Sequence, residues 1–309
     1  MSKRNVIGVC ALLLVFGLSI WFLTGFREEE PSLKGKKLSK WISEYRLSAN
    51  PASREEAERA VLAIGTNALP TFLHWIQQED SSLRAKVFRL VRRLPGNKTD
   101  LRQAIHKRGL AGFGFHILGS EARPAIPELT RLLENDASAI DFPAKLMVAE
   151  SAVAALREIG SPAIPALVQA VTNRHESVRK AAAQTLGEFG TTAAQAVPAL
   201  VGCLSDTNAE MRLLAVRSLG QIGQDENVVV PALANILADR WELNRIAAAT
   251  ALRAFGPRAE SAAPHLLQIL TNQSESDQVR DVAKKALAAI SGSADVRNDA
   301  NEIAPPNSR

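Results

Sequence analysis

The sequence predicts an all-α chain, an α-α superhelix (solenoid) of stacked helix pairs preceded by one transmembrane helix. Three observations predict this fold class. Of the 309 residues, 46% are hydrophobic but only 5% are aromatic, so small aliphatic side chains must fill the core, as in closely stacked helices. A motif recurs every 33 residues, and a run of 21 uncharged residues lies near the N-terminus. The two cysteines, Cys10 and Cys203, cannot form a disulfide framework or a cysteine-based zinc site.

The uncharged run at 6–26 is long enough to cross a bilayer, because at 1.5 Å per residue it spans roughly 30 Å. Two basic residues precede it and the acidic run 28–30 follows it, so the positive-inside rule places the N-terminus in the cytoplasm. We therefore expect residues 1–30 to be a signal anchor that contacts the lipid bilayer through 6–26. The chain would be a single-pass protein of the cytoplasmic (inner) membrane of a bacterium, with the solenoid extracytoplasmic. A cleaved signal peptide, ending near 17–19, is the alternative.

The segments that flank the repeats differ in character. Residues 31–50 are expected to form a linker and a capping helix. One apolar face of this helix would consist of Leu38, Trp41, Ile42 and Tyr45. Residues 291–309 are polar and contain proline, so we expect a disordered tail.

The 33-residue period organises residues 51–290 into about seven units. In each clear unit an arginine, a leucine, a glycine and a proline keep one register. The three clearest units contain Arg179, Gly190 and Pro198; Arg212, Gly223 and Pro231; and Arg245, Gly256 and Pro264. Weaker copies carry Arg54, Arg84, Arg108 and Arg280. Four columns in one register indicate a repeat array rather than two ordinary domains.

We interpret each unit as two helices. The first carries apolar residues such as Leu186 and Leu219 at helical spacing and ends at the glycine, which tolerates a left-handed backbone. The second begins with the proline, whose missing N–H is harmless in the first turn of a helix. Such pairs cannot bury their apolar faces alone and must stack on neighbouring pairs.

These repeats resemble a known family. The first-helix pattern, as in EMRLLAVRSLGQIG, and the second-helix pattern, as in QAVPALVGCL, are similar to HEAT repeats. They resemble in particular the short bacterial repeats that also occur in phycobilin lyase subunits. The resemblance covers about 240 of the 309 residues and implies an α-solenoid that acts as a protein-binding scaffold.

The sequence contains no nucleotide-binding glycine loop, nucleophile elbow or paired-histidine metal helix. We therefore expect a membrane-anchored scaffold that binds a protein or peptide, with no catalysis of its own, no cofactor and no metal. Two alternatives stay open, a lyase-assisting protein of the phycobilin lyase type and a HEAT-type nucleic-acid binder. Bound chromophore would indicate the first, and steeply salt-dependent DNA binding the second.

The candidate protein-binding residues lie one and four positions after the prolines of the second helices, which are expected to line the concave face. They are small or polar and almost uncharged, which suits a helix or an extended peptide and makes nucleic acid an unlikely partner. These residues are Ala166, Gln169, Ala199, Gly202, Ala232, Asn235, His265 and Gln268.

Charge is concentrated in one segment. The formal net charge is +5, while residues 82–110 contain nine basic residues and one acid. This segment is interpreted as a solvated face, or as a contact with anionic lipid or an acidic partner. Its candidate basic patch consists of Arg84, Lys86, Arg89, Arg92 and Arg93.

Two further patterns favour a structural interpretation. The arginine that recurs in every unit is expected to hydrogen-bond between neighbouring repeats. The pair His175-Glu176 resembles the His-Glu pairs that bind iron in deoxyhypusine hydroxylases, which are HEAT-like. It occurs once here, and one pair cannot supply a multi-ligand iron site, so His175 is expected to be a surface histidine.

Overall fold

The structure, a computed structural model, describes residues 30–78, 103–134 and 142–292. Contacts between Cα atoms divide the chain into two compact units, residues 1–71 and 72–309. Each unit is described by itself below.

The first unit begins with a small hairpin. Strand β1 (Ser32–Leu33) pairs antiparallel with β2 (Lys36–Lys37), and the two residues between the strands have φ values of 53° and 73°. Positive φ at both central positions is typical of a tight hairpin turn. This hairpin was not predicted, because two-residue strands leave no alternating pattern in the sequence.

Helix α2 (Leu38–Leu47) follows the hairpin and packs against α3 (Pro51–Ile64), which leads into the 3-10 turn η1 (Gly65–Ala68). The predicted apolar face of α2 is buried: Leu38, Trp41, Ile42 and Tyr45. The Trp41 Nε1–H donates to the backbone oxygen of Leu33 at 3.2 Å, which ties the hairpin to the helix.

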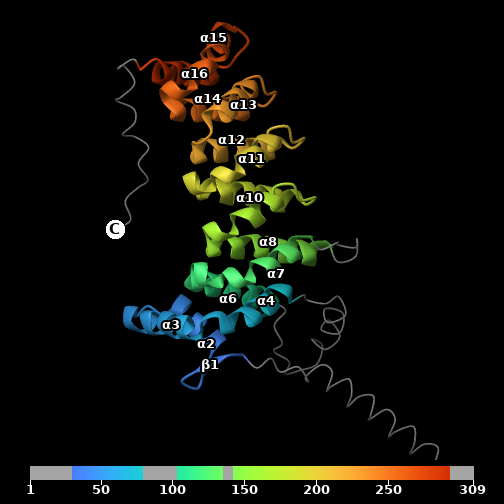
Figure 1. Cartoon of the computed structure of the whole chain (residues 1–309), viewed down its shortest axis with the longest axis vertical. Coiled ribbons are helices and arrows are strands. Elements are labelled where there is room, and N and C mark those ends of the chain that lie inside the picture. The colour runs from blue at the N-terminus through green and yellow to red at the C-terminus, as the bar shows by residue number, and fades with distance from the viewer. Residues whose placement is uncertain (1–29, 79–102, 135–141, 293–309) are drawn as a thin grey trace, which may run out of the picture. The chain divides into compact units, whose positions relative to one another are not determined.

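In its described residues the second unit is helical, and its helices follow one another along the stack in chain order (Figure 1). The chain enters it through α4 (Leu69–Gln77). What we call first helices are α6 (Gln103–Leu118), α8 (Phe142–Ile159), α10 (Glu176–Glu188), α12 (Ala209–Ile222), α14 (Glu242–Phe255) and α16 (Asp277–Ile290). What we call second helices are α7 (Ile126–Glu134), α9 (Ile164–Ala170), α11 (Val197–Cys203), α13 (Glu226–Ile236) and α15 (Ala263–Thr271).

The 3-10 turns η2 (Gly119–Ala125), η3 (Ser161–Ala163), η4 (Gly190–Ala196) and η5 (Gly256–Ala262) connect first helices to second helices. Each first helix packs on the next one, from α6 to α16, and each first helix from α8 to α16 also packs on the second helix that precedes it. Contacts are thus made between neighbouring repeats, which is the pattern of a solenoid. The predicted all-α repeat solenoid is confirmed.

Helix α12 shows why the repeat folds as it does. The Asn208 side chain accepts hydrogen bonds from the backbone N–H groups of Glu210 and Met211 at 2.8 and 3.1 Å, which caps the N-terminus. Gly223 ends the helix in the left-handed conformation, with φ 61° and ψ 22°. Leu219 is fully buried between these ends, as predicted.

First helices approach one another closely where the sequence has glycine. A Cβ atom added to Gly187 in α10 would lie 2.9 Å from the Cα of Ser218 in α12, closer than such atoms come in proteins. The Ser218 hydroxyl also donates to the backbone oxygen of Ala183 at 2.7 Å, across the same contact. A glycine facing a serine therefore sets the short distance between α10 and α12.

Helix α16 differs from the first helices before it. Four residues after its arginine stands Lys284, which is exposed, whereas Ala183, Val216 and Ala249 hold this place in α10, α12 and α14 and are fully buried. One position that is apolar and buried in the preceding repeats is therefore charged and exposed in α16.

The predicted inner-membrane location is wrong and is corrected here. In the part of the chain that the structure describes, no helix combines the length and the apolar character needed to span a bilayer. The run 6–26, on which the prediction of a transmembrane helix and a signal anchor rested, lies outside the described residues. The tail from residue 293 onward and residues 82–102 of the basic segment also lie outside them.

Candidate functional site

The loops that lead into the first helices carry an arginine–acid ladder, a term used here for the pairs Arg179–Asp206, Arg212–Asp239 and Arg245–Glu275. The Arg212 guanidinium donates from Nη1 to the backbone oxygen of Asp206, in its own loop, at 2.9 Å. Its Nε and Nη2 donate to the Asp239 carboxylate of the next repeat at 2.6 and 3.0 Å. The two side chains are only 9% and 7% exposed. This bidentate pair fixes the spacing of two repeats.

The other two pairs follow the same plan. Arg179 lies 3.2 Å from the Asp206 carboxylate and Arg245 lies 2.7 Å from the Glu275 carboxylate. Each of these arginines also donates from Nη1 to the backbone oxygen of the residue six positions before it, at 2.9 and 2.8 Å. One guanidinium thus joins its own loop to the loop of the next repeat.

The predicted structural role of the arginine column is confirmed at these three positions. Arg108 acts in a related way, since it donates to the backbone oxygens of Ile76 and Gln78 at 3.2 and 2.7 Å. Arg54, in the first unit, instead lies over a tyrosine ring, with 4.9 Å to the ring centroid. Arg84 lies outside the described residues.

Two carboxylates of the ladder, Asp239 and Glu275, keep their charge although their side chains are buried. Burial raises the pKa of the Asp239 carboxyl, but hydrogen bonds from Arg212 and from the backbone N–H of Trp241 outweigh it, so the pKa lies below its ordinary value of 3.8. Burial also raises the pKa of Glu275, while hydrogen bonds from Arg245 and a neighbouring backbone N–H lower it below its ordinary value of 4.5. Both groups are therefore anionic at neutral pH.

The predicted binding residues lie on the second helices, but they are not equally accessible. Gln169, Gly202, Asn235, His265 and Gln268 are exposed. Ala199 and Ala232 are half-buried. Ala166 is only 5% exposed, so it contributes almost nothing to this surface, contrary to the expectation that all eight positions are open. We call the exposed and half-buried members together the second-helix surface.

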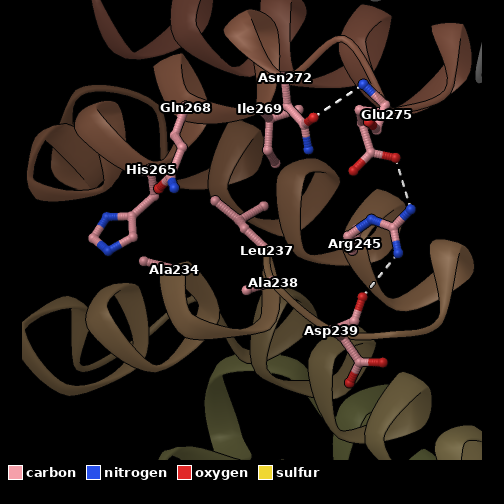
Figure 2. Close-up of a pocket in the computed structure, with 11 residues that line it drawn as sticks. Ala234, Leu237, Ala238, Asp239, Arg245, His265, Gln268, Ile269, Asn272 and Glu275 are labelled. Carbon is pink, nitrogen blue, oxygen red and sulfur yellow. Dashed lines mark hydrogen bonds and ion pairs between the residues drawn. The ribbon is translucent and has the colours of Figure 1, made fainter.

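A pocket of about 410 Å³ lies at one end of this surface, between α13, α15 and the loops that follow them (Figure 2). Two of the binding residues predicted from the sequence, His265 and Gln268, line this pocket. The remaining lining on this side is apolar and comes from Ala234, Leu237, Ala238 and Ile269.

The opposite side of the pocket is charged. Figure 2 shows Arg245 between Asp239 and Glu275, with its guanidinium bound to the backbone oxygen of the first and the carboxylate of the second. Asn272 and Ser274 complete this side, and the Ser274 N–H donates to the Asn272 side chain at 3.0 Å. The pocket therefore combines an apolar wall with a partly buried ion pair.

The pocket coincides with a break in the repeat register. From the proline of the second helix to the arginine of the next first helix there are 14 residues in the units of Pro165, Pro198 and Pro231, but 16 from Pro264 to Arg280. The ladder acid in this unit is Glu275, where the two preceding units have aspartates. The two extra residues and the longer acid were visible in the sequence, but their effect on the surface was not predicted.

An exposed tryptophan lies in the loop that supplies Asp239. The Trp241 residue is 52% exposed, and its backbone N–H donates to the Asp239 carboxylate at 2.8 Å. Trp241 occupies the N-cap position of α14 without a side-chain cap, whereas Asn208 and Ser276 cap the corresponding helices α12 and α16. The position thus lacks a cap that typically contributes about 1 kcal/mol.

The remaining candidates take no part in this site. Arg84, Lys86, Arg89, Arg92 and Arg93 lie outside the described residues. His175 precedes α10 and accepts a hydrogen bond from the Arg174 side chain at 3.1 Å. Across residues 30–78, 103–134 and 142–292, no three His, Cys, Asp or Glu side chains are grouped so that they could hold a metal ion.

Helix pairs that contact only their neighbours, with a ladder on one edge and an open second-helix surface, define a helical-repeat scaffold. A family model for HEAT repeats matches residues 126–209, 164–253 and 197–288. These overlapping matches together cover more than half of the chain. The chain therefore belongs to the HEAT-repeat family, as the sequence pattern suggested.

Several solved structures are similar to this chain. An engineered protein aligns with a TM-score of 0.43 and 20% identity, over 82% of this chain and 96% of that one. A mutant of Kap121p aligns with a TM-score of 0.48 and 13% identity, over 82% of this chain and 29% of that one. Kap121p bound to the extreme C-terminus of the protein phosphatase Cdc14p gives 0.47 and 15%, over 82% and 29%. Among curated proteins, none matches.

Proposed function

We propose that this HEAT-repeat chain is a protein-binding scaffold whose second-helix surface holds an extended or helical segment of a partner protein. The observation that supports this most directly is the unused hydrogen-bonding capacity of that surface. The side-chain amides of Gln169, Asn235 and Gln268 recur at one position per repeat and make no hydrogen bond within the described part of the chain. In this proposal the chain presents a surface and catalyses no reaction.

The chemistry of the surface suits a peptide. A primary amide offers both donors and an acceptor, so it can pair with the N–H and C=O groups of a peptide backbone without selecting for charge. Gly202, Ala199 and Ala232 are small, so a partner backbone can come close to the helices between the amides. A surface without charge gives little affinity for phosphate backbones, so a nucleic acid is the weaker candidate.

The test needs a partner segment, which a random peptide library can supply by selection on the full chain. Peptides that bind would be synthesised and titrated by fluorescence anisotropy. The double variant Ala199→Arg plus Ala232→Arg should weaken binding by at least about tenfold, because the long side chains fill the space above two adjacent second helices. Its helical content should stay unchanged.

Ala254→Arg is the matched control. Ala254 is exposed on the first helix α14, so the same change in size and charge falls outside the second-helix surface. It should leave peptide affinity unchanged. Equal affinity of the double variant and the wild type for every selected peptide would refute the proposed surface.

A further inference from the structure

Glu275 is the member of the arginine–acid ladder whose carboxylate is not fully used. In the two earlier pairs both carboxylate oxygens have a partner. Asp206 forms an ion pair with Arg179 through one oxygen and accepts a hydrogen bond from a backbone N–H through the other. Asp239 is held through both oxygens by Arg212. Glu275 accepts from Arg245 and from the Ser276 N–H through the same oxygen, Oε1.

The second carboxylate oxygen of Glu275 faces the pocket. The Glu275 side chain is only 7% exposed, and Figure 2 shows its second oxygen on the side of the pocket, away from Arg245. No hydrogen bond from the described residues reaches this oxygen. A ligand that brings a donor into the pocket would form a charge-assisted hydrogen bond with it.

The lining also decides what kind of donor fits. Two carboxylates and one guanidinium line the pocket, so with histidine counted as neutral its formal charge is −1. The Asp239 carboxylate is already engaged by Arg212, which leaves Glu275 as the acceptor. Between His265 and Glu275 lie Leu237 and Ile269, an apolar wall along which an alkyl chain can pack (Figure 2). An apolar stem with a cationic end matches both features.

We infer that the pocket is a recognition site for one basic side chain, lysine or arginine, of the bound peptide. The alkyl stem packs against Leu237 and Ile269, and the cationic group donates to the second oxygen of Glu275. This inference rests on the proposed function, because it assumes that a peptide lies on the second-helix surface. It adds that one side chain of the peptide is recognised where the repeat register changes, in the pocket that His265 and Gln268 line.

The experiment uses the peptides selected on the full chain. Those that bind should share a lysine or arginine. Replacing it by its neutral isostere, norleucine for lysine or citrulline for arginine, should weaken binding to the wild type by at least about tenfold. The variant Glu275→Gln should lose a similar factor for the basic peptide. In this variant the isostere should cause little further loss, since the two changes remove one interaction.

Two controls keep the outcome clear. Asp277→Asn removes the same charge two residues away, on a side chain that is 98% exposed, and should not change affinity. Ala238→Leu should block the pocket without changing its charge and weaken binding as Glu275→Gln does, which tests the site even if Glu275→Gln does not fold.

Peptides that bind the second-helix surface but lack a common basic residue, or that bind Glu275→Gln and Ala238→Leu as well as wild type, would overturn the inference. The proposed function would then still stand. A loss of binding in Ala199→Arg plus Ala232→Arg tests that function separately, because neither alanine lines the pocket.

Discussion

At the scale of single residues, two glycines inside helices have opposite roles. Gly187 lies where α10 meets α12, and an added Cβ would come within 2.9 Å of the Ser218 backbone. Gly202 lies in α11 with nothing within 4 Å of the position of its Cβ. Glycine lowers helix stability relative to alanine at both sites, but only at Gly187 does packing require it.

We therefore predict opposite effects of the same substitution. Gly187→Ala should lower the free energy of unfolding by about 1–3 kcal/mol, because the extra methyl group overpacks the contact with α12. Gly202→Ala should raise it by up to about 1 kcal/mol, through helix propensity alone. Urea unfolding followed by circular dichroism measures both. A stabilised Gly187→Ala variant would show that α10 and α12 are farther apart than the structure has them.

At the scale of elements, the arginine–acid ladder links the loops of successive repeats, and its strength depends on pH. The folded-state pKa values of Asp239 and Glu275 lie below the ordinary values of 3.8 and 4.5. A carboxyl group with a lowered pKa stabilises the fold above its ordinary pKa. That contribution is lost as the pH falls through the folded-state value. The ladder should therefore weaken below about pH 4.5, and not on the alkaline side.

The prediction concerns the slope of stability against pH. Below pH 4.5 the free energy of unfolding of the wild type should fall more steeply than that of the double variant Asp239→Asn plus Glu275→Gln, which has no such carboxyls to protonate. At neutral pH the variant should be less stable than the wild type, because Arg212 would keep a buried charge without its anion. Parallel curves would mean that the ladder pairs contribute nothing that is lost on protonation.

The elements differ in how well the sequence predicts them. First and second helices were predictable because arginine, leucine, glycine and proline each mark one place in the unit. The bridging role of Arg179, Arg212 and Arg245 was predictable for the same reason, since one arginine per unit at a loop meets the same neighbour each time. The hairpin before α2 was not, because its strands are two residues long.

The site was only half predictable. His265 and Gln268 were identified from their register after a proline, and they line the pocket. Leu237, Arg245 and Glu275 were missed, because a rule based on one helix face cannot show that a loop with two extra residues opens a space beside it. Ala166 was placed on the surface by the same rule, yet it is buried. The position of a residue in the repeat predicts the direction of its side chain, but it does not predict which neighbouring residues bury that side chain.

At the scale of the whole molecule, the second unit is held together by contacts between neighbouring repeats. Its stability should therefore be close to a sum over repeats and over the contacts between them. A repeat can then be removed without loss of the fold if the register of the ladder is kept.

Deleting residues 191–223 tests this directly. The deletion joins Gly190 to the start of α13, so Arg179 would meet Asp239 in place of Asp206, a carboxylate at the same position of the unit. The shortened chain should keep a helical spectrum and a cooperative transition at a lower melting temperature. A deletion of 201–217, whose length of 17 residues is not a multiple of the period, should unfold the array, because it breaks the register of both helices and ladder. Equal behaviour of the two deletions would contradict the nearest-neighbour description.

The exposed indole of Trp241 can serve as an intrinsic fluorescent probe. The other two tryptophans in the described residues, Trp41 and Trp75, are buried at 4% and 0% exposure. Collisional quenchers in water therefore reach Trp241 in preference to those two. Its backbone N–H is bound to Asp239, which lines the pocket, so the indole lies in the loop that forms one wall of that pocket. In a variant with Trp21 replaced by phenylalanine, quencher-sensitive emission can thus follow events at the register break, since Trp41 and Trp75 are shielded.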